Sequence, residues 1–193
     1  MYHECFRLFL GSDSHHGIIS NTMRQNGFTL FELLVAMTIA ALLITIGVPN
    51  MRAMIMDNRI ISEANHFVAT INAARSSAVR YQRPAIVCST SNFSATTPTC
   101  SGSTDWSDGW IVWVDKDMDG NTTADEVVVV APPVSGSVSM NSGTANRFSY
   151  DSRGFGTATG DTINFCDDRS GETGRAIRVN AAGRVNIAAQ GCS

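Results

Sequence analysis

Residues 28–48 read FTLFELLVAMTIAALLITIGV, and Glu32 is the only charged residue in this stretch. A helix rises about 1.5 Å per residue, so the stretch matches the roughly 30 Å hydrocarbon core of a bilayer. It is also longer than the apolar region of a secretory signal peptide, which has about 7 to 15 residues. A buried core helix of a soluble protein is the alternative, but such helices are rarely apolar on every face for this length. The stretch therefore predicts a membrane helix.

Glu32 is the unusual residue of this helix, because a carboxylate inside a membrane costs roughly 2.5 to 3.5 kcal/mol and should have a partner. No basic residue lies within the stretch. Cleavage of the chain after Gly27 would create an amino group on Phe28, one helical turn before Glu32. The carboxylate would then lie in the first turn, where the helix dipole favours a negative charge.

The motif Gly27-Phe28-Thr29-Leu30-Phe31-Glu32 resembles the processing site of type IV prepilins. The resemblance implies that a prepilin peptidase cleaves between Gly27 and Phe28 and methylates the new amine. It also implies that Glu32 pairs with the amine of a neighbouring subunit in a helical filament. Residues 1–27 would then be a leader that is removed. Because this leader is long for the short-leader class, we expect translation to start at Met23.

Pro49 follows the apolar stretch. It matches the proline that kinks pilin helices, although by itself it indicates only a helix interruption. Residues 49–83 continue as an amphipathic helix, which should end near Tyr81 because Pro84 disfavours helical geometry in the residue before it. Apolar residues at helical spacing predict its buried stripe: Met54, Ile61, Ala64, Val68, Ile71, Ala74 and Ala78. Polar residues predict its exposed surface: Asn58, Ser62, Asn65, His66, Asn72 and Ser76.

Residues 84–193 change to short β-type runs separated by turn formers, and consecutive strands without helices between them predict antiparallel sheets. The predicted strands are Ala85 to Ser89, Trp110 to Val114, Glu126 to Ala131, Val138 to Met140, Arg147 to Tyr150, Thr162 to Cys166, Ala176 to Asn180 and Arg184 to Ala188. We expect Trp106, Trp110 and Trp113 to pack in the core and hairpins rather than to form a ligand-binding box.

This order of elements resembles the minor pseudopilins of the GspH and FimT family. The implied fold is α+β and type IV pilin-like: a long N-terminal helix, membrane-spanning in its first half, packed on a small antiparallel β-sheet domain. The implied function is a low-abundance subunit that primes and joins a type IV filament, either the pseudopilus of type II secretion or a type IV pilus. Its partners would be the prepilin peptidase, other pilins or pseudopilins and the inner-membrane assembly platform. Its N-terminus would be cytoplasmic, and its C-terminal domain would be periplasmic on the bacterial inner membrane.

Four of the five cysteines follow the membrane helix, which fits an oxidising periplasm. Four cysteines allow three pairings, and we expect the local one, Cys88 with Cys100 and Cys166 with Cys192. A zinc site is the alternative, although the sequence has no CxxC pair. An anchored enzyme is disfavoured, because the chain lacks a nucleophile elbow, a zinc motif and a phosphate loop, and His66 is the only histidine after the leader.

An acidic segment between two predicted strands matches the spacing of a calcium-binding loop. Asp115, Asp117 and Asp119 alternate before Gly120, and Glu126 follows six residues after the glycine. The flanking segments are strands rather than the helices of an EF-hand. The alternatives are therefore a solvated β-turn and a calcium site made of these four acidic residues.

The C-terminal residues 169–193 hold four arginines against one acidic residue. The net charge of the whole chain is −3, which excludes a generally basic nucleic-acid binder, so any affinity for DNA must be local. Gly183-Arg184-Val185-Asn186 is similar to a Gly-Arg-x-Arg motif of FimT-like proteins of DNA-uptake pili, with Asn186 in place of the second arginine. A hairpin could gather Arg175, Arg178 and Arg184 for phosphates. The alternative is solvated strand residues that flank a turn.

Overall fold

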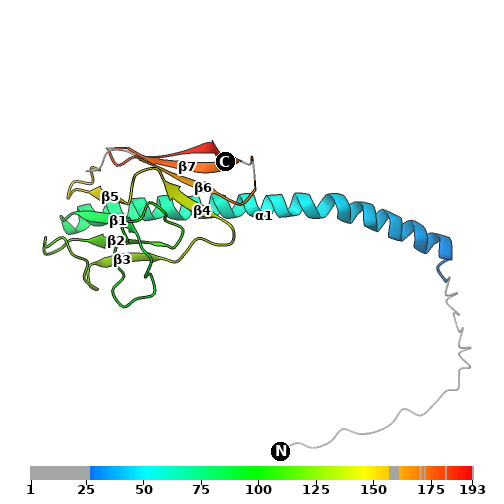
Figure 1. Cartoon of the computed structure of the whole chain (residues 1–193), viewed down its shortest axis with the longest axis horizontal. Coiled ribbons are helices and arrows are strands. Elements are labelled where there is room, and N and C mark those ends of the chain that lie inside the picture. Colours follow the sequence, from blue (N-terminus) through cyan, green and yellow to red (C-terminus); the bar gives the residue numbers. More distant parts are fainter. Residues whose placement is uncertain (1–26, 157–160, 170, 172, 181, 193) are drawn as a thin grey trace, which may run out of the picture. The chain divides into compact units, whose positions relative to one another are not determined.

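The computed structural model of the protein describes residues 27–156, 161–169, 171, 173–180 and 182–192. The chain divides into two units, and the boundary between them lies between Ile44 and Thr45. In the described residues one helix is followed by eight strands (Figure 1). The predicted leader, apart from Gly27, and the start proposed at Met23 lie outside the described residues.

The helix, α1 (Leu30–Tyr81), has 52 residues. Thr29 caps its N-terminus, because the Thr29 Oγ1 accepts a hydrogen bond from the Glu32 N–H at 3.2 Å. Pro49 lies inside α1, and the helix continues through it. Its last residue is Tyr81, which confirms the end predicted from Pro84.

The eight strands form two antiparallel four-stranded sheets, in the orders β3-β2-β1-β5 and β4-β6-β7-β8. Three strands have the predicted bounds, and the others differ by one to three residues at one or both ends. The strands are β1 (Ala85–Ser89), β2 (Trp110–Val114), β3 (Val127–Ala131), β4 (Ser139–Ser142), β5 (Arg147–Tyr150), β6 (Asp161–Cys166), β7 (Thr173–Val179) and β8 (Val185–Gly191). One helix packed on antiparallel sheets confirms the predicted α+β class.

The core of the second unit lies between the C-terminal half of α1 and both sheets. Phe67, fully buried on α1, is in ring contact with side chains from both sheets and from the loop before β2. Its centroid lies 5.6 Å from Trp106, 5.6 Å from Trp110, 6.3 Å from Phe148 and 6.1 Å from Phe165. Trp106, Trp110 and Trp113 are buried, which confirms that they pack in the interior.

The buried face of α1 corrects the predicted stripe. Met54 is 65% exposed and Ile61 is 36% exposed, whereas Ile60 and Phe67, which the prediction omitted, are buried. The apolar residues buried on α1 are Ile60, Ala64, Phe67, Ile71, Ala74 and Ala78. The polar surface is as predicted: Asn58, Ser62, Asn65, His66, Asn72 and Ser76 are exposed.

Candidate assembly segment and ligand sites

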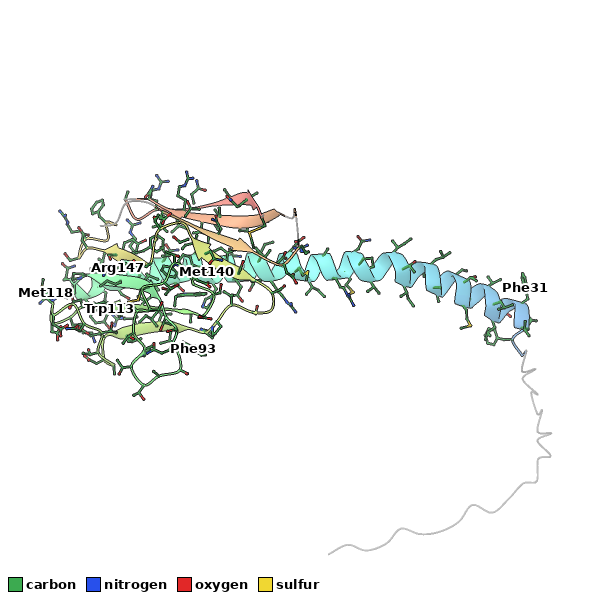
Figure 2. All side chains as sticks on the ribbon, viewed as in Figure 1. Phe31, Phe93, Trp113, Met118, Met140 and Arg147 are labelled. Carbon is green, nitrogen blue, oxygen red and sulfur yellow. A yellow bond between two sulfur atoms is a disulfide. The ribbon has the colours of Figure 1, made fainter. Side chains whose placement is uncertain are left out.

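The N-terminal part of α1 carries an uncovered apolar surface. Every large apolar side chain from Phe28 to Ile55 is exposed in this chain, with Phe28 83% and Phe31 75% exposed (Figure 2). By length and composition this helix could cross a membrane, and none of its most apolar window is buried. Glu32 is exposed in its first turn. Over residues 28–48 the helix therefore presents one carboxylate at the start of an apolar surface that carries no other charge.

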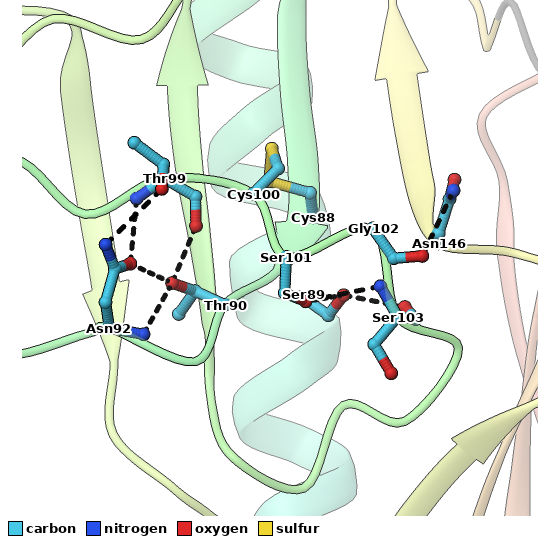
Figure 3. Close-up of a disulfide and its surroundings, with 10 residues drawn as sticks. All are labelled: Cys88, Ser89, Thr90, Asn92, Thr99, Cys100, Ser101, Gly102, Ser103 and Asn146. Carbon is cyan, nitrogen blue, oxygen red and sulfur yellow. Dashed lines mark hydrogen bonds between the residues drawn. A yellow bond between two sulfur atoms is a disulfide. The ribbon is translucent and has the colours of Figure 1, made fainter.

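The first disulfide joins Cys88 on β1 to Cys100 and closes a loop rich in hydroxyl side chains (Figure 3). Inside this loop the Thr90 Oγ1 donates to the Thr99 carbonyl at 2.8 Å, and the Asn92 Oδ1 accepts from the Thr99 N–H at 3.0 Å. These bonds satisfy the polar groups of the loop locally. The disulfide and these hydrogen bonds thus fix the conformation of the loop.

The second disulfide joins Cys166, the last residue of β6, to Cys192, which follows β8. Strand β7 lies between these two strands, so the disulfide crosses it. It crosses at Gly174, where an added Cβ would lie 2.5 Å from the Cys192 Sγ and 3.2 Å from the Cys166 Sγ. Both disulfides follow the local pairing. The sequence does not reveal the role of Gly174, because nothing in its spacing marks the crossing point.

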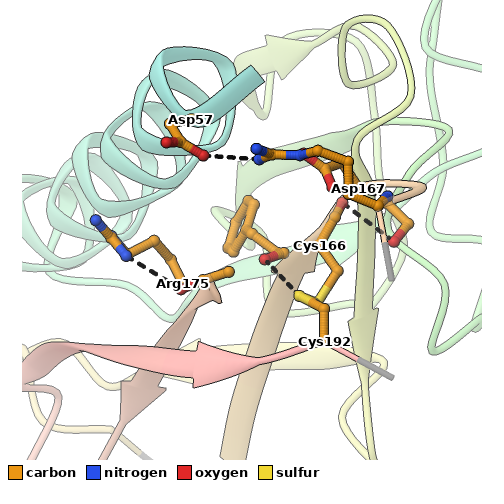
Figure 4. A network of polar contacts seen from close by, with 9 residues as sticks. Asp57, Cys166, Asp167, Arg175 and Cys192 are labelled. Carbon is orange, nitrogen blue, oxygen red and sulfur yellow. Dashed lines mark hydrogen bonds and ion pairs between the residues drawn. A yellow bond between two sulfur atoms is a disulfide. The ribbon is translucent and has the colours of Figure 1, made fainter. Parts of the chain in front are cut away.

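Arg169 links the β6–β7 connection to α1. Its guanidinium lies 2.7 Å from the Asp57 Oδ1 on α1 and 2.7 Å from the Asp167 Oδ2, in the network shown in Figure 4. The hydrogen bond from the Arg169 side chain holds the pKa of Asp167 below its usual range. Because its charge is paired twice, Arg169 is a structural residue of the C-terminal basic segment.

The acidic segment between β2 and β3 brings three of its four predicted carboxylates together. One oxygen each of Asp115, Asp117 and Glu126 lies within 4.8 Å of the others. Asp119 lies outside this group, which corrects the four-residue ligand set, and its carboxylate accepts hydrogen bonds from the Asn121 N–H at 2.7 Å and from the Asn121 side chain.

Glu126 is buried and holds the turn. Its Oε1 accepts from the Lys116 N–H at 2.7 Å, and its Oε2 accepts from the Thr123 N–H at 3.1 Å and from the Thr123 Oγ1 at 2.8 Å. Burial raises the pKa of Glu126, but these hydrogen bonds outweigh it, so the pKa lies below its ordinary value. The neighbouring Asp115 Oδ1 is buried without a hydrogen-bond partner in the described residues. Both carboxylate oxygens of Glu126 are therefore hydrogen-bonded within the turn, whereas the Asp115 Oδ1 is not hydrogen-bonded in the described residues.

The β7–β8 hairpin brings two of the three predicted arginines together. Arg178 and Arg184 line one hollow of about 350 Å³ on the outer face of the sheet, together with Asn180, Val185 and Asn186. Among the ion pairs of the described residues, neither arginine takes part in one.

Arg175 corrects the proposed group of three. It lies three positions before Arg178 on β7, and side chains alternate along a strand, so the two arginines are on opposite faces. The face of Arg175 is that of the buried Ile177, and its Nη1 donates to the Gly174 carbonyl at 3.2 Å.

Two family models match the sequence. Residues 63–183 match the model of the type II transport protein GspH, and residues 22–48 match the model of the prokaryotic N-terminal methylation motif. No curated protein matches the sequence.

Solved structures of a type IV minor pilin have a similar fold. A crystal structure of FimU from Pseudomonas aeruginosa superposes with a TM-score of 0.51 at 17% identity, over 68% of this chain and 89% of that chain. A second crystal form of FimU gives a TM-score of 0.45 at 18% identity, over 66% of this chain and 90% of that chain. At this identity, the first of these matches shows a shared fold.

Proposed function

The chain belongs to the family of the type II transport protein GspH, and from that premise we propose that it is a minor subunit that primes and joins a type IV filament. The filament is either the pseudopilus of type II secretion or a type IV pilus. The observation that carries the proposal is the apolar surface from Phe28 to Ile55, with Glu32 at its start. The match to the N-terminal methylation motif over residues 22–48 supports it.

The apolar surface of α1 must be in contact with lipid or with other apolar helices both before and after assembly. Apolar side chains exposed over the whole circumference of a helix are stable in lipid or against other apolar helices, but not in water. In the proposed cycle the segment first spans the bacterial inner membrane, with the N-terminus cytoplasmic and the β-sheets periplasmic. The inner-membrane assembly platform then transfers it to a filament, where the helices of other pilins replace the lipid.

In the proposal, Glu32 favours transfer of the helix from the membrane into the filament. A carboxylate in lipid is costly and gains stability from a nearby positive charge. In the proposal the prepilin peptidase cuts between Gly27 and Phe28 and methylates the new amine, and Glu32 pairs with the amine of the neighbouring subunit. The pairing then favours the position in the filament over the position in lipid.

Mass spectrometry of the membrane-purified protein tests the processing step. We expect a mature N-terminus at Phe28 carrying one methyl group, and an intact Met23 or Met1 would overturn the proposal. In a second experiment Glu32→Gln should leave the protein in the membrane but lower its recovery in sheared filaments. Thr38→Val is the matched control, because it removes a polar group from the same segment, where the Thr38 Oγ1 donates to the Val35 carbonyl one turn earlier. Equal recovery of the two variants in sheared filaments would contradict a role of Glu32 in assembly.

The phenotype of a deletion strain shows whether the protein belongs to a type II secretion pseudopilus or to a type IV pilus. A deletion strain is scored for exoprotein secretion, twitching and DNA uptake, and restored with the wild-type chain. Loss of secretion alone assigns the pseudopilus, and loss of twitching or uptake assigns the pilus. Full retention of all three would contradict a role in either filament.

DNA binding during uptake is the second candidate function. It is favoured by the hollow that Arg178 and Arg184 share, where two guanidinium groups can each hold a phosphate oxygen. DNA affinity should fall with salt, and each lost phosphate contact should lower the slope of log affinity against log salt by about 0.9. We expect Arg178→Ala and Arg184→Ala to weaken binding. Arg175→Ala, on the other face of the same strand, is the control, and an equal loss in all three variants would argue against the hollow.

For the acidic turn we propose weak calcium binding by Asp115, Asp117 and Glu126. The supporting observation is the buried Asp115 Oδ1, which has no hydrogen-bond partner among the residues that the structure describes, since a hard cation would satisfy this oxygen. Glu126 already accepts hydrogen bonds at both oxygens and would contribute one remaining lone pair rather than close the site with two oxygens. Calcium would supply charge neutralisation at the turn.

A further inference from the structure

Three segments meet at one end of the second unit: the C-terminal part of α1, the loop 151–156 after β5 and the turn between β7 and β8 (Figure 1). A Cβ on Gly154, in the loop, would lie 3.3 Å from both the Cγ and the Nε of Arg75 on α1. A Cβ on Gly183, in the turn, would lie 3.2 Å from the Gly154 carbonyl oxygen. The loop therefore lies between the side chain of Arg75 and the residue that precedes Arg184.

Glycine is required at both of these contact points. Gly183 has a φ of 73°, and a Cβ there would lie 2.7 Å from the Tyr150 Cε1. Gly154 has a φ of 81°, and a Cβ there would also lie 3.1 Å from the Val79 Cγ2. With standard backbone dimensions, these contacts place the Arg75 Nε within about 12 Å of the Gly183 Cα. The helix and the hairpin turn are therefore close enough to contact one ligand.

Arg75 has no partner for its charge among the described residues. It takes part in none of their ion pairs, and its guanidinium donates none of their hydrogen bonds. Burial raises the pKa of Tyr150 to about 12, and the positive charge of Arg75 opposes this rise, so the two side chains are close together. Arg75 is half-buried, with its stem against Gly154. Packing therefore holds its positive charge in place, and an anion can pair with it.

The three segments carry more positive than negative charge. The sequence has no acidic residue from Ala64 to Tyr81 on α1 or from Thr173 to Gly191 in the β7–β8 hairpin. Asp151 is the acidic residue of the loop, and its carboxylate is ion-paired with Arg153 at 3.1 Å. Asp161, at the start of β6, already accepts hydrogen bonds from side chains and backbone. An anion at this end of the unit therefore meets unpaired arginines rather than unpaired carboxylates.

We propose that a DNA duplex lies across the β7–β8 turn, with phosphates held by Arg178 and Arg184 on one side of the turn and by Arg75 on the other. The inference rests on the DNA binding proposed above for the hollow of Arg178 and Arg184. Duplex DNA carries about one negative charge per 1.7 Å of its axis, so several phosphates fall within reach of the three side chains. Arg75 thus takes the place that was predicted for Arg175.

Fluorescence anisotropy of a labelled DNA duplex with the full chain in detergent tests the inference. Arg75→Gln keeps the stem that packs on Gly154 and removes the charge. It should lower the magnitude of the slope of log affinity against log salt by about 0.9, because one phosphate contact is lost. Its loss of affinity should therefore be about threefold larger at 50 mM than at 200 mM salt. Unrelated DNA sequences should show the same loss, since a phosphate contact does not read bases.

Arg59→Gln is the matched control. Arg59 is an exposed arginine of the same helix, and it also packs on a glycine, since a Cβ on Gly136 would lie 2.7 Å from its Nη1. It lies about 24 Å from Arg75 along the helix axis, so the duplex at the turn should not reach it. Arg59→Gln should therefore leave the salt slope unchanged. Arg75→Lys should retain most of the slope, because the charge remains.

The outcomes distinguish this inference from the DNA function itself. Absence of binding by the wild-type chain overturns both. Binding that Arg184→Ala weakens but Arg75→Gln leaves unchanged overturns this inference alone. An equal decrease of the slope in Arg59→Gln overturns it as well, because total charge rather than position would then explain the loss. Denaturant unfolding followed by tryptophan fluorescence verifies that the two glutamine variants are folded, and Arg75→Lys gives the same comparison if one is not.

Discussion

Gly174 lies directly beneath Cys192: a Cβ on this glycine would be 2.5 Å from the Cys192 Sγ. The same atom would also collide with the Phe165 carbonyl oxygen. The glycine is therefore required for a steric reason, since its backbone does not have a positive φ. It is the point where the sheet leaves room for a disulfide to pass over a strand.

Gly174→Ala should prevent this disulfide from closing or force β7 out of the sheet. Loss of a native disulfide costs typically about 2 to 4 kcal/mol of unfolding free energy. The measurement is a free-thiol count on the unreduced, denatured full chain, where we expect two more thiols per molecule than in the wild-type chain. Gly191→Ala is the control, because nothing lies within 4 Å of a Cβ at that position. Full oxidation of Gly174→Ala would show that the neighbouring strands can shift to make room.

Phe67→Ala should lower the unfolding free energy by about 3 to 5 kcal/mol, because it leaves a cavity among four aromatic rings. Denaturant unfolding of the full chain in detergent, followed by tryptophan fluorescence, measures this directly, since Trp106 and Trp110 border the cavity. Ile61→Ala on the same helix should cost much less, because Ile61 is 36% exposed. A larger effect at Ile61 than at Phe67 would contradict the described packing of α1.

Arg169→Ala should destabilise the β6–β7 connection more than Asp57→Ala does. Removing the guanidinium leaves Asp167, whose side chain is 2% exposed, as a buried carboxylate without its partner, at a cost of about 3 kcal/mol. Asp57 is 54% exposed, and its loss leaves Arg169 still paired with Asp167. Unfolding of the two variants at pH 7 makes the comparison, and equal stability would show that solvent already screens the buried pair.

Acid should destabilise the protein through Asp161. Burial raises the pKa of Asp161, but hydrogen bonds from Thr162, Thr144, Ser142 and Ala145 outweigh it, and the pKa lies below its usual value. A lowered folded-state pKa contributes stability above the unfolded value of about 3.9, and this stability is lost as the pH falls through the folded pKa. The unfolding free energy should therefore decrease below about pH 4, and Asp161→Asn should show a smaller decrease. An identical acid slope in the variant would exclude this carboxylate as a cause.

Calcium titration of the full chain should show weak binding, with a dissociation constant of about 0.1 to 1 mM, which is the range of the weakest calcium-binding modules. Asp115→Asn should abolish the heat signal, because it removes the charge from the unsatisfied oxygen. Asp119→Asn should keep it, since Asp119 lies outside the carboxylate group. Absence of heat from the wild-type chain at millimolar calcium would leave the segment as a turn organised by Glu126.

The sequence predicted the bounds of the helix and strands better than it predicted which face of α1 is buried. The end of α1 and the bounds of β1, β2 and β5 follow from local features such as Pro84 and short apolar runs. The buried stripe of α1 could not be predicted in the same way. Apolar residues occur in adjacent pairs, Ile60 with Ile61 and Phe67 with Val68, and either member of a pair completes a helical spacing of apolar residues. Only the packing of the sheets against α1 decides between them.

The candidate sites show the same limit. Arg175 and Arg178 are close in sequence, but they are three residues apart on β7, so the alternation of side chains along the strand places them on opposite faces. Glu126 has the spacing of a calcium ligand, yet its burial beside Thr123 makes it an acceptor for backbone groups. Spacing along the chain identified the chemistry of these residues but not their tertiary partners.

The connectivity of the two disulfides has a consequence for the order of oxidation. After the leader, each cysteine is joined to the next along the chain, Cys88 to Cys100 and Cys166 to Cys192. A chain that meets an oxidant from its N-terminal end forms each native pair before the next cysteine pair arrives. Oxidation in chain order would therefore form these two bonds without rearranging a non-native one.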